Sequence, residues 1–220
     1  MQNDFTREVG ELLAGLGNSL LISAIGIVLG ICIGIALGAV RYARVPVAGT
    51  VVAWFVNVFR CTPLLVQIFL LFYALPDLGI RLTPFETSWL ALALWGGAYQ
   101  TEVFRAAFEA VPKGEVTAAR ALGLPALQTF LDVTLPIAFR IAVTGATTTA
   151  ITQFRSSSFM IVVGYQELTY VANRIVSDTF KVFETFGLAC LMYLVVCSLI
   201  SIASRFLERR IAIPGLGVAK

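Results

Sequence analysis

The strongest constraint on the fold is an apolar run over residues 12–40 that contains no charged residue. An α-helix crosses the hydrocarbon core of a bilayer with about 20 apolar residues, so this run is long enough to span a membrane. Of the 220 residues, 58% are hydrophobic and 13% are charged, whereas a soluble domain is about 25% charged. The sequence therefore predicts an integral membrane protein.

Four more apolar runs follow, at about residues 51–75, 88–110, 139–163 and 185–204. Together with the first run they predict an all-α membrane protein with five transmembrane helices, folded as a single domain over residues 1–220. Asp4, Glu8 and Glu11 precede the first run, in contrast to the basic start of a cleaved signal peptide. We therefore expect the first span to be retained.

The first run carries Gly26, Gly30, Gly34 and Gly38, one glycine at every fourth position. Small residues at this spacing let a second membrane helix approach closely. Each step of four residues advances about 40° around the helix, so the glycines form a winding groove rather than a straight face. We expect a helix to pack along this groove, either as an ordinary contact or as a surface on which another span slides.

Five spans place the two termini on opposite sides, and lysine and arginine decide which side is cytoplasmic. The loops on one side carry ten such residues, and those on the other side carry four. The ten are Arg41, Arg44, Arg105, Lys113, Arg120, Arg140, Arg205, Arg209, Arg210 and Lys220, and the four are Arg7, Arg81, Arg174 and Lys181. We therefore expect the N-terminus outside and the C-terminus in the cytoplasm, on the same side as the loop between spans three and four.

Several kinds of chemistry are missing from the sequence. It has no histidine, which excludes a Ser-His-Asp triad and a histidine proton relay. No lysine follows a glycine, so the chain has no phosphate-binding P-loop. All four aspartates lie outside the apolar runs, which excludes an intramembrane aspartyl protease. The four cysteines form no CxxC pair, and we expect them to be small buried hydrophobes. We expect no catalysis, no metal site, no cofactor of its own and no nucleic-acid partner.

A charged segment over residues 111–136 separates the third and fourth spans and is too short and too polar to cross a membrane. Pro112 suits the first turn of a short helix, and Gly123 followed by Pro125 suits its end. Ala118, Ala119 and Ala121 are expected to give this helix a small, smooth face. Leu122 and Leu124 are candidate anchors beside that face.

From Ala118 to Pro136 the spacing resembles the EAA loop of ATP-binding-cassette (ABC) importer permeases, with Thr117 at the position of the family glutamate and Val133 at that of an isoleucine. The resemblance implies a type I importer permease core, in which a coupling helix docks into a cleft of an ATPase subunit. The implied coupling residues are Glu115, Ala118, Ala119, Arg120, Leu122, Gly123, Leu135 and Pro136.

Three other segments, residues 58–67, 97–105 and 164–169, resemble motifs of the polar amino-acid permeases (the histidine, glutamate and general amino-acid group), with Cys61 at a usual glycine. The resemblance runs from about residue 18 to 209. It implies the transmembrane subunit of an ATP-driven amino-acid importer in a bacterial inner membrane. The implied partners are two ABC ATPases that bind ATP and Mg²⁺, a second permease chain, identical or related, and an extracytoplasmic solute-binding protein.

Charged residues at membrane depth usually face a cavity or one another, which makes Arg60, Glu102 and Arg155 candidates for the substrate path. Arg60 and Arg105 could instead snorkel to the interface, and Glu102 could pair with an arginine. Arg155 lies in a run of hydroxyls and amides at residues 144–158 that suits a pore or pocket better than lipid. The residues predicted to bind substrate or line its path are Arg60, Thr62, Gln67, Tyr99, Glu102, Gln153, Arg155, Ser156, Ser157 and Ser158.

Residues 155–159 read Arg-Ser-Ser-Ser-Phe, where the commonest family pattern is K-D-T-S-L. The acidic residue that would attract a cationic substrate is therefore absent, and a guanidinium with hydroxyls suits a carboxylate. An acidic, neutral polar or broad range of amino acids is favoured over arginine. Alternatives are a permease for a related solute, such as an opine or a sulfur amino acid, a secondary transporter or channel without an ATPase, and a membrane scaffold.

Overall fold

A computed structural model describes residues 2–211, which fold into helices and loops with no strand among them. The predicted all-α class is confirmed for these residues, whereas Lys220, which was counted for the orientation, lies outside them. The α-helices are α1 (Gln2–Tyr42), α2 (Pro46–Cys61), α3 (Leu64–Phe69), α4 (Pro84–Glu109), α5 (Lys113–Ala121), α6 (Ala126–Gln128), α7 (Leu135–Ser156), α8 (Leu168–Thr179) and α9 (Val182–Ile211). Shorter 3₁₀ and π-helical turns continue α3, precede α7 at Thr129–Thr134, and extend α7 over Ser157–Val163.

Three helical stretches in the described residues are long and apolar enough to cross a membrane: Phe5–Tyr42, Ala126–Val163 and Val182–Arg210. A fourth is possible if α2 and the helix that begins at Leu64 count as one span, but these two are bent by 106°. The apolar run at residues 51–75 is therefore not one straight helix. Helix α4, the predicted third span, is outside this set, because it carries more polar residues. The count of five spans stays a prediction.

The glycine groove of α1 packs against α4. Gly26, Gly30, Gly34 and Gly38 are all buried. A Cβ atom built on Gly34 would lie 2.4 Å from the Cβ atom of Gln100. A side chain there would collide with α4, so the absence of side chains sets how closely the two helices approach. The predicted packing surface is confirmed, and its partner is α4.

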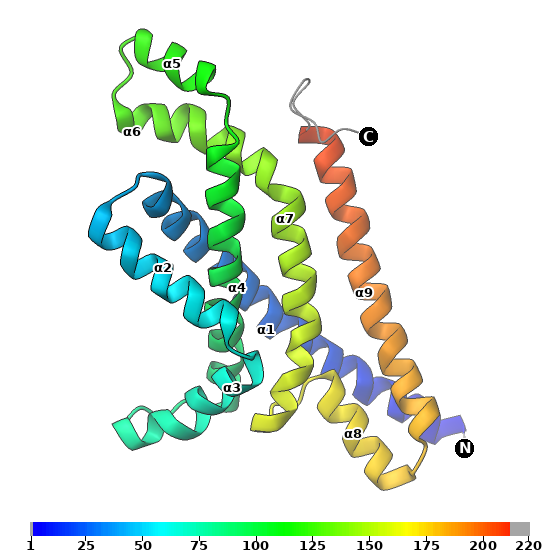
Figure 1. Cartoon of the computed structure of the whole chain (residues 1–220). Helices are drawn as coiled ribbons and strands as arrows, with labels where there is room; N and C mark the ends of the chain where they lie inside the picture. The colour runs from blue at the N-terminus through cyan, green and yellow to red at the C-terminus, as the bar shows by residue number, and fades with distance from the viewer. Residues whose placement is uncertain (1, 212–220) are drawn as a thin grey trace.

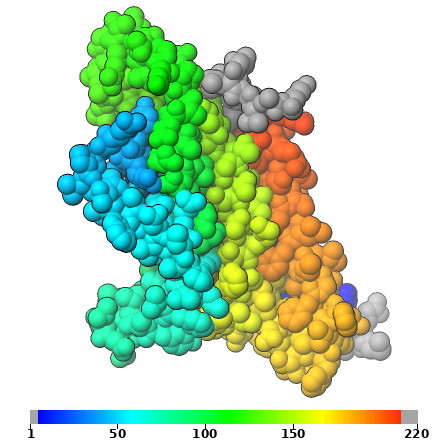
Figure 2. Space-filling view, viewed as in Figure 1, coloured from blue at the N-terminus to red at the C-terminus, as the bar shows by residue number. Residues whose placement is uncertain are grey.

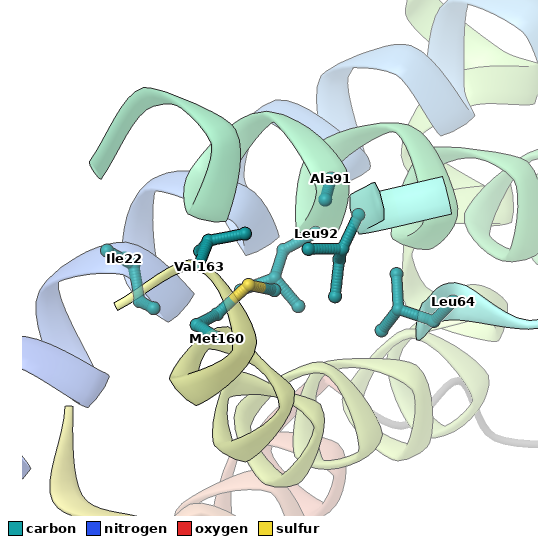
Figure 3. Packing of buried hydrophobic residues seen from close by; sticks show 7 residues of the cluster. Ile22, Leu64, Ala91, Leu92, Met160 and Val163 are labelled. Atoms are coloured by element: carbon teal, nitrogen blue, oxygen red, sulfur yellow. The ribbon is translucent and has the colours of Figure 1, made fainter. Parts of the chain in front are cut away.

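A hydrophobic core joins α1, α3, α4 and the 3₁₀ turn after α7, as Figure 3 shows. Ile22, Leu92 and Met160 are fully buried there, and Leu64 contributes from the start of α3. This core fixes α3 against the long helices immediately after the bend.

Helix α5 and the C-terminal end of α9 lie at one end of the molecule, and the N-terminus lies at the other (Figure 1). In the space-filling view the green lobe of α5 and α6 projects beyond the bundle (Figure 2). The expectation that the cysteines are buried is wrong for this chain, because Cys32, Cys61 and Cys190 are exposed. They lie on outward-facing sides of helices, which a bilayer or another chain would cover.

Candidate functional site

The polar run of α7 divides into two faces, and one of them is buried. Thr149, Gln153 and Ser157 point into the protein. The Gln153 amide nitrogen donates hydrogen bonds to the carbonyl oxygens of Gly26 in α1 at 3.2 Å and Leu92 in α4 at 2.9 Å. Gln153 therefore connects three helices.

Glycine makes room for this amide in both partner helices. Gly30 and Gly96 each lie four residues beyond the carbonyl that accepts a hydrogen bond from Gln153. A Cβ atom on Gly96 would lie 2.0 Å from the amide nitrogen of Gln153, and one on Gly30 would lie 3.3 Å from it. A side chain at residue 96 cannot coexist with this contact, so Gly96 and Gln153 form one structural unit.

The opposite face of α7 is open and also polar. Thr144, Thr148 and Arg155 are exposed, Thr152 is half-buried, and helix geometry places the four within about 80° of one another. The threonine hydroxyls at 148 and 152 donate to carbonyls one turn earlier, at 3.0 and 2.9 Å. The Arg155 guanidinium donates a long hydrogen bond of 3.4 Å to the hydroxyl of Thr152. An arginine exposed on a membrane-spanning helix is costly in lipid, so this face needs water or another protein chain.

The three serines after Arg155 do not surround it as the sequence suggested. The hydroxyl of Ser157 is buried and donates to the Phe154 carbonyl at 2.7 Å, and that of Ser158 donates to the Arg155 carbonyl at 2.9 Å. Both bonds go to carbonyls in the last turn of α7, where the helix tightens into the 3₁₀ turn. Ser156 is half-buried. Two of the three hydroxyls that were expected beside the Arg155 guanidinium therefore bind the backbone instead.

Arg60 and Tyr99 come together from α2 and α4. The guanidinium carbon of Arg60 lies 5.1 Å from the centre of the Tyr99 ring, within the range of a cation–π contact. Trp95 lies one turn earlier, with its ring centre 4.4 Å from that of Tyr99. This pair places an exposed cation on an aromatic surface next to the bend between α2 and α3.

Thr62 and Gln67 hold that bend. The Gln67 amide nitrogen donates to the carbonyls of Phe59 and Thr62 at 2.9 and 3.1 Å and to the Thr62 hydroxyl at 2.9 Å. Pro63 has no backbone N–H and cannot continue the helix, so the carbonyls at the end of α2 need other partners. Both residues were predicted to line the substrate path, and in this structure their side chains bind groups at the end of α2 instead.

Glu102 belongs to an ion-pair cluster that joins the end of α1 to α4. It pairs with Arg41 from α1 and, at 2.9 Å, with Arg105 from its own helix. Arg105 also pairs with Glu109 at 2.8 Å. The predicted pairing of Glu102 with an arginine is confirmed. The cluster lies in the last turns of α4, immediately before the segment that leads to α5.

The charged segment forms the short helix that the sequence predicted. Helix α5 begins at Lys113 after Pro112, and Gly123 follows its C-cap with φ at +86°. The N–H groups of Gly123 and Leu124 donate to the carbonyls of Arg120 and Ala119 at 3.0 and 3.2 Å, which is a Schellman motif. An L-residue at 123 would be strained there, so the glycine fixes this helix end.

The predicted coupling residues take different positions on this lobe. Leu122 is 84% exposed and is open to contact from outside, whereas Ala119 is only 5% exposed and holds α5 to the chain. The expected common alanine face is therefore divided, with Ala118 and Ala121 outside. The exposed members are Glu115, Ala118, Arg120, Leu122, Gly123 and Pro136, and Leu135 is half-buried.

Sequence reasoning missed Glu167, a fully buried carboxylate that caps α8. It accepts hydrogen bonds from the backbone N–H groups of Thr169 and Tyr170 at 2.8 and 2.7 Å and from the Tyr193 hydroxyl at 2.9 Å. Burial raises the pKa of Glu167 above its ordinary value, and these hydrogen bonds oppose the rise. The available signal was an acidic residue directly before the first turn of a helix.

Comparison with known proteins agrees with this architecture. Residues 26–213 match the family described as "Binding-protein-dependent transport system inner membrane component". The probable glutamine ABC transporter permease protein of Bacillus subtilis is 34% identical, over 87% of this chain and 89% of its own. An arginine transport system permease protein of the same organism is 28% identical over 96% and 98%.

Among solved structures, the crystal structure of an amino acid ABC transporter with histidines superposes with a TM-score of 0.86 at 26% identity. The match covers 94% of this chain and 97% of that one. The relatives are permease subunits of ABC transporters and not enzymes, in agreement with the predicted lack of catalysis. The chain therefore belongs to the family of binding-protein-dependent transport system inner membrane components.

Proposed function

We propose that this chain is the transmembrane subunit of an ATP-driven importer of polar amino acids. The observation that carries the proposal is α5, a short polar helix that projects beyond the bundle between two long helical segments (Figure 2). Its exposed Leu122 and the small residues beside it suit insertion into a cleft of a partner protein. The ion pairs of Glu102 join α1 to α4 directly before α5. A displacement of α5 would therefore be transmitted to both of these helices.

The partners follow from this role. Two ABC ATPases would dock on the α5 helices of two permease chains, identical or related, and would bind ATP and Mg²⁺ themselves. This chain would bind no cofactor. An extracytoplasmic solute-binding protein would deliver substrate at the opposite end. Closure of the ATPases would bring the α5 helices together and open the path outward, and hydrolysis would reset it, which is alternating access between two states.

The proposed orientation has α5 and the C-terminus in the cytoplasm and the N-terminus outside, in a bacterial inner membrane. It rests on the excess of lysine and arginine in the loops on the α5 side. The α5 lobe and the C-terminal end of α9 lie at the same end of the molecule (Figure 1), as this orientation requires.

The substrate path would run along the open face of α7. Thr144, Thr148, Thr152 and Arg155 offer hydroxyl oxygens and one guanidinium, which suit the carboxylate of an amino acid. The exposed cation of Arg60 on Tyr99 would be a second anchor of the same charge. An acidic, neutral polar or broad range of substrates is favoured, because this face carries no carboxylate for a cationic side chain. An opine or a sulfur amino acid is the alternative.

The arginine permease among the relatives makes substrate competition the necessary test of this part. Uptake of labelled glutamine by the complete transporter should be inhibited by glutamate or other polar amino acids at least as strongly as by arginine. Inhibition by arginine or lysine alone would contradict the proposed range. The result would leave the importer assignment intact, because that part rests on α5.

The importer assignment is tested by purifying the tagged chain from its host in mild detergent. A P-loop ATPase should co-purify at one copy per permease chain, and mass spectrometry would identify it. Leu122→Asp should abolish this association, whereas Leu78→Asp, at a leucine that is 77% exposed on the segment after α3, should leave it unchanged. If no ATPase appears, even after cross-linking through α5, a secondary transporter becomes the better explanation.

A further inference from the structure

An apolar cleft lies between α1, α4, α7 and α9, on the side of α7 that also carries Gln153 and away from the open polar face of that helix. A hollow of about 150 Å³ is lined by Ile31, Phe104, Ala146 and Leu207, among others. A second hollow of about 400 Å³ shares Phe139 and Leu207 with the first and extends toward the start of α7. The two hollows are therefore parts of one continuous cleft.

The length of this cleft fits one leaflet of a membrane. Its lining extends along α7 from Leu135 to Thr147, which is about 18 Å of helix at 1.5 Å per residue. Half of the hydrocarbon core is about 15 Å thick. At its deep end the Ser204 hydroxyl donates a hydrogen bond of 2.8 Å to that of Thr147 and joins α9 to α7. An acyl chain could enter from the α5 end as far as this bond.

The mouth of the cleft carries a positive charge. Arg140 lines the outer hollow and is exposed, and none of the carboxylates in the described residues forms an ion pair with it. Glu208, at the same end of α9, faces Ser204, with a carboxylate oxygen 3.1 Å from the Ser204 hydroxyl oxygen. A long arginine side chain reaches the headgroup level from within the apolar zone. Basic pockets between membrane helices on the cytoplasmic side select anionic headgroups.

We propose that this cleft binds one anionic phospholipid, with an acyl chain between α7 and α9 and the phosphate on Arg140. The proposal uses the orientation given under the proposed function, since the anionic leaflet must face the α5 end. The lipid would fill the space beside Leu135 and Pro136, where the projecting lobe joins α7. It would thereby hold α9 at a fixed distance from the helix that carries the proposed substrate face.

The test is native mass spectrometry of the full chain, with any subunits that stay bound, after exchange into detergent with phosphatidylglycerol or phosphatidylcholine. The wild-type chain should retain phosphatidylglycerol about fivefold more than phosphatidylcholine, the contribution of one arginine near the headgroups. Arg140→Gln should bring the two lipids to equal retention. Arg44→Gln, which removes an exposed arginine from the turn after α1, should keep the preference. Ala146→Phe should lower the retention of both lipids, because it fills the deep hollow.

Equal retention of both lipids by the wild-type chain would overturn the proposal, as would a preference that survives Arg140→Gln. A photoreactive group on the acyl chain of phosphatidylglycerol should label the peptides that contain Phe139 or Leu207. If a photoreactive residue at 139 instead captures residues 212–220 or a second copy of the chain, the cleft has another occupant. None of these results bears on co-purification of an ATPase, so the lipid site and the importer assignment fail separately.

Discussion

The two faces of α7 have similar residue types and opposite surroundings. Thr149 and Gln153 are buried against α1 and α4, whereas Thr148 and Arg155, one or two residues away in sequence, are exposed. On the buried face Gln153 binds the backbone of α1 and α4 and holds the three helices together, whereas Thr149 and Ser157 donate to carbonyls of their own segment. On the open face the threonine hydroxyls bond within their own helix, and each keeps acceptor capacity for another molecule. The same run of hydroxyls and amides thus serves packing on one side and is free for recognition on the other.

The largest expected effect is the loss of the buried face. Gly96→Ala would bring a methyl group against the amide of Gln153, and overpacking of this kind costs about 1–3 kcal/mol. Thermal unfolding of the purified chain in detergent should show a clear loss of stability. In a Gln153→Ala background the same change should cost much less, because the colliding amide is gone. Equal costs in the two backgrounds would show that Gly96 and Gln153 are not coupled.

The next effect concerns Arg155 on the open face. Arg155→Ala should leave expression and thermal stability nearly unchanged, because its one protein hydrogen bond is 3.4 Å long. The Michaelis constant for uptake should rise about tenfold or more, the range expected when a charged hydrogen bond to substrate is lost. Arg155→Lys should recover part of the affinity. Unchanged uptake kinetics in Arg155→Ala would remove this residue from the path.

The sequence predicts some of these features and not others. The glycine spacing of α1 and the ends of α5 were predictable, because glycine and proline act locally. The bend after α2 also had a signal, since Pro63 breaks a helix and restricts the residue before it. The inward face of α7 had none, because a run that is polar on all sides has no hydrophobic periodicity. The bonds of Gln153 depend on two other helices, which no local pattern encodes.

A finer comparison uses two adjacent threonines. Thr148→Val should lower uptake by a few fold and leave stability within about 0.5 kcal/mol. Thr149→Val makes the same chemical change at a buried position, where the hydroxyl donates to Gly145 at 3.1 Å, and should leave uptake unchanged in the protein that folds. Both variants need the same two assays, uptake in proteoliposomes and thermal unfolding. The reverse pattern would mean that the two faces are assigned the wrong way round.

The smallest expected effect is a pH dependence from Glu167, beyond the end of α7. Because burial raises its pKa in the folded chain, the folded state holds this proton more tightly than the unfolded state. The free energy of unfolding should therefore fall as the pH rises from 4.5, the ordinary glutamate value, to the raised pKa, and level off above it. Glu167→Gln should flatten this part of the profile. An unchanged slope in that variant would assign the dependence to another group.

Cysteine accessibility along α7 tests the division into two faces most directly. In a variant without the four natural cysteines, single cysteines would replace Thr144, Thr148, Thr152 and Arg155 on one face and Thr149, Gln153 and Ser157 on the other. In the assembled transporter in membranes, a polar, membrane-impermeant thiol reagent should label the first set, and substrate should slow that labelling. The second set should stay unlabelled. Equal labelling of both sets, or none on the open face, would contradict the account.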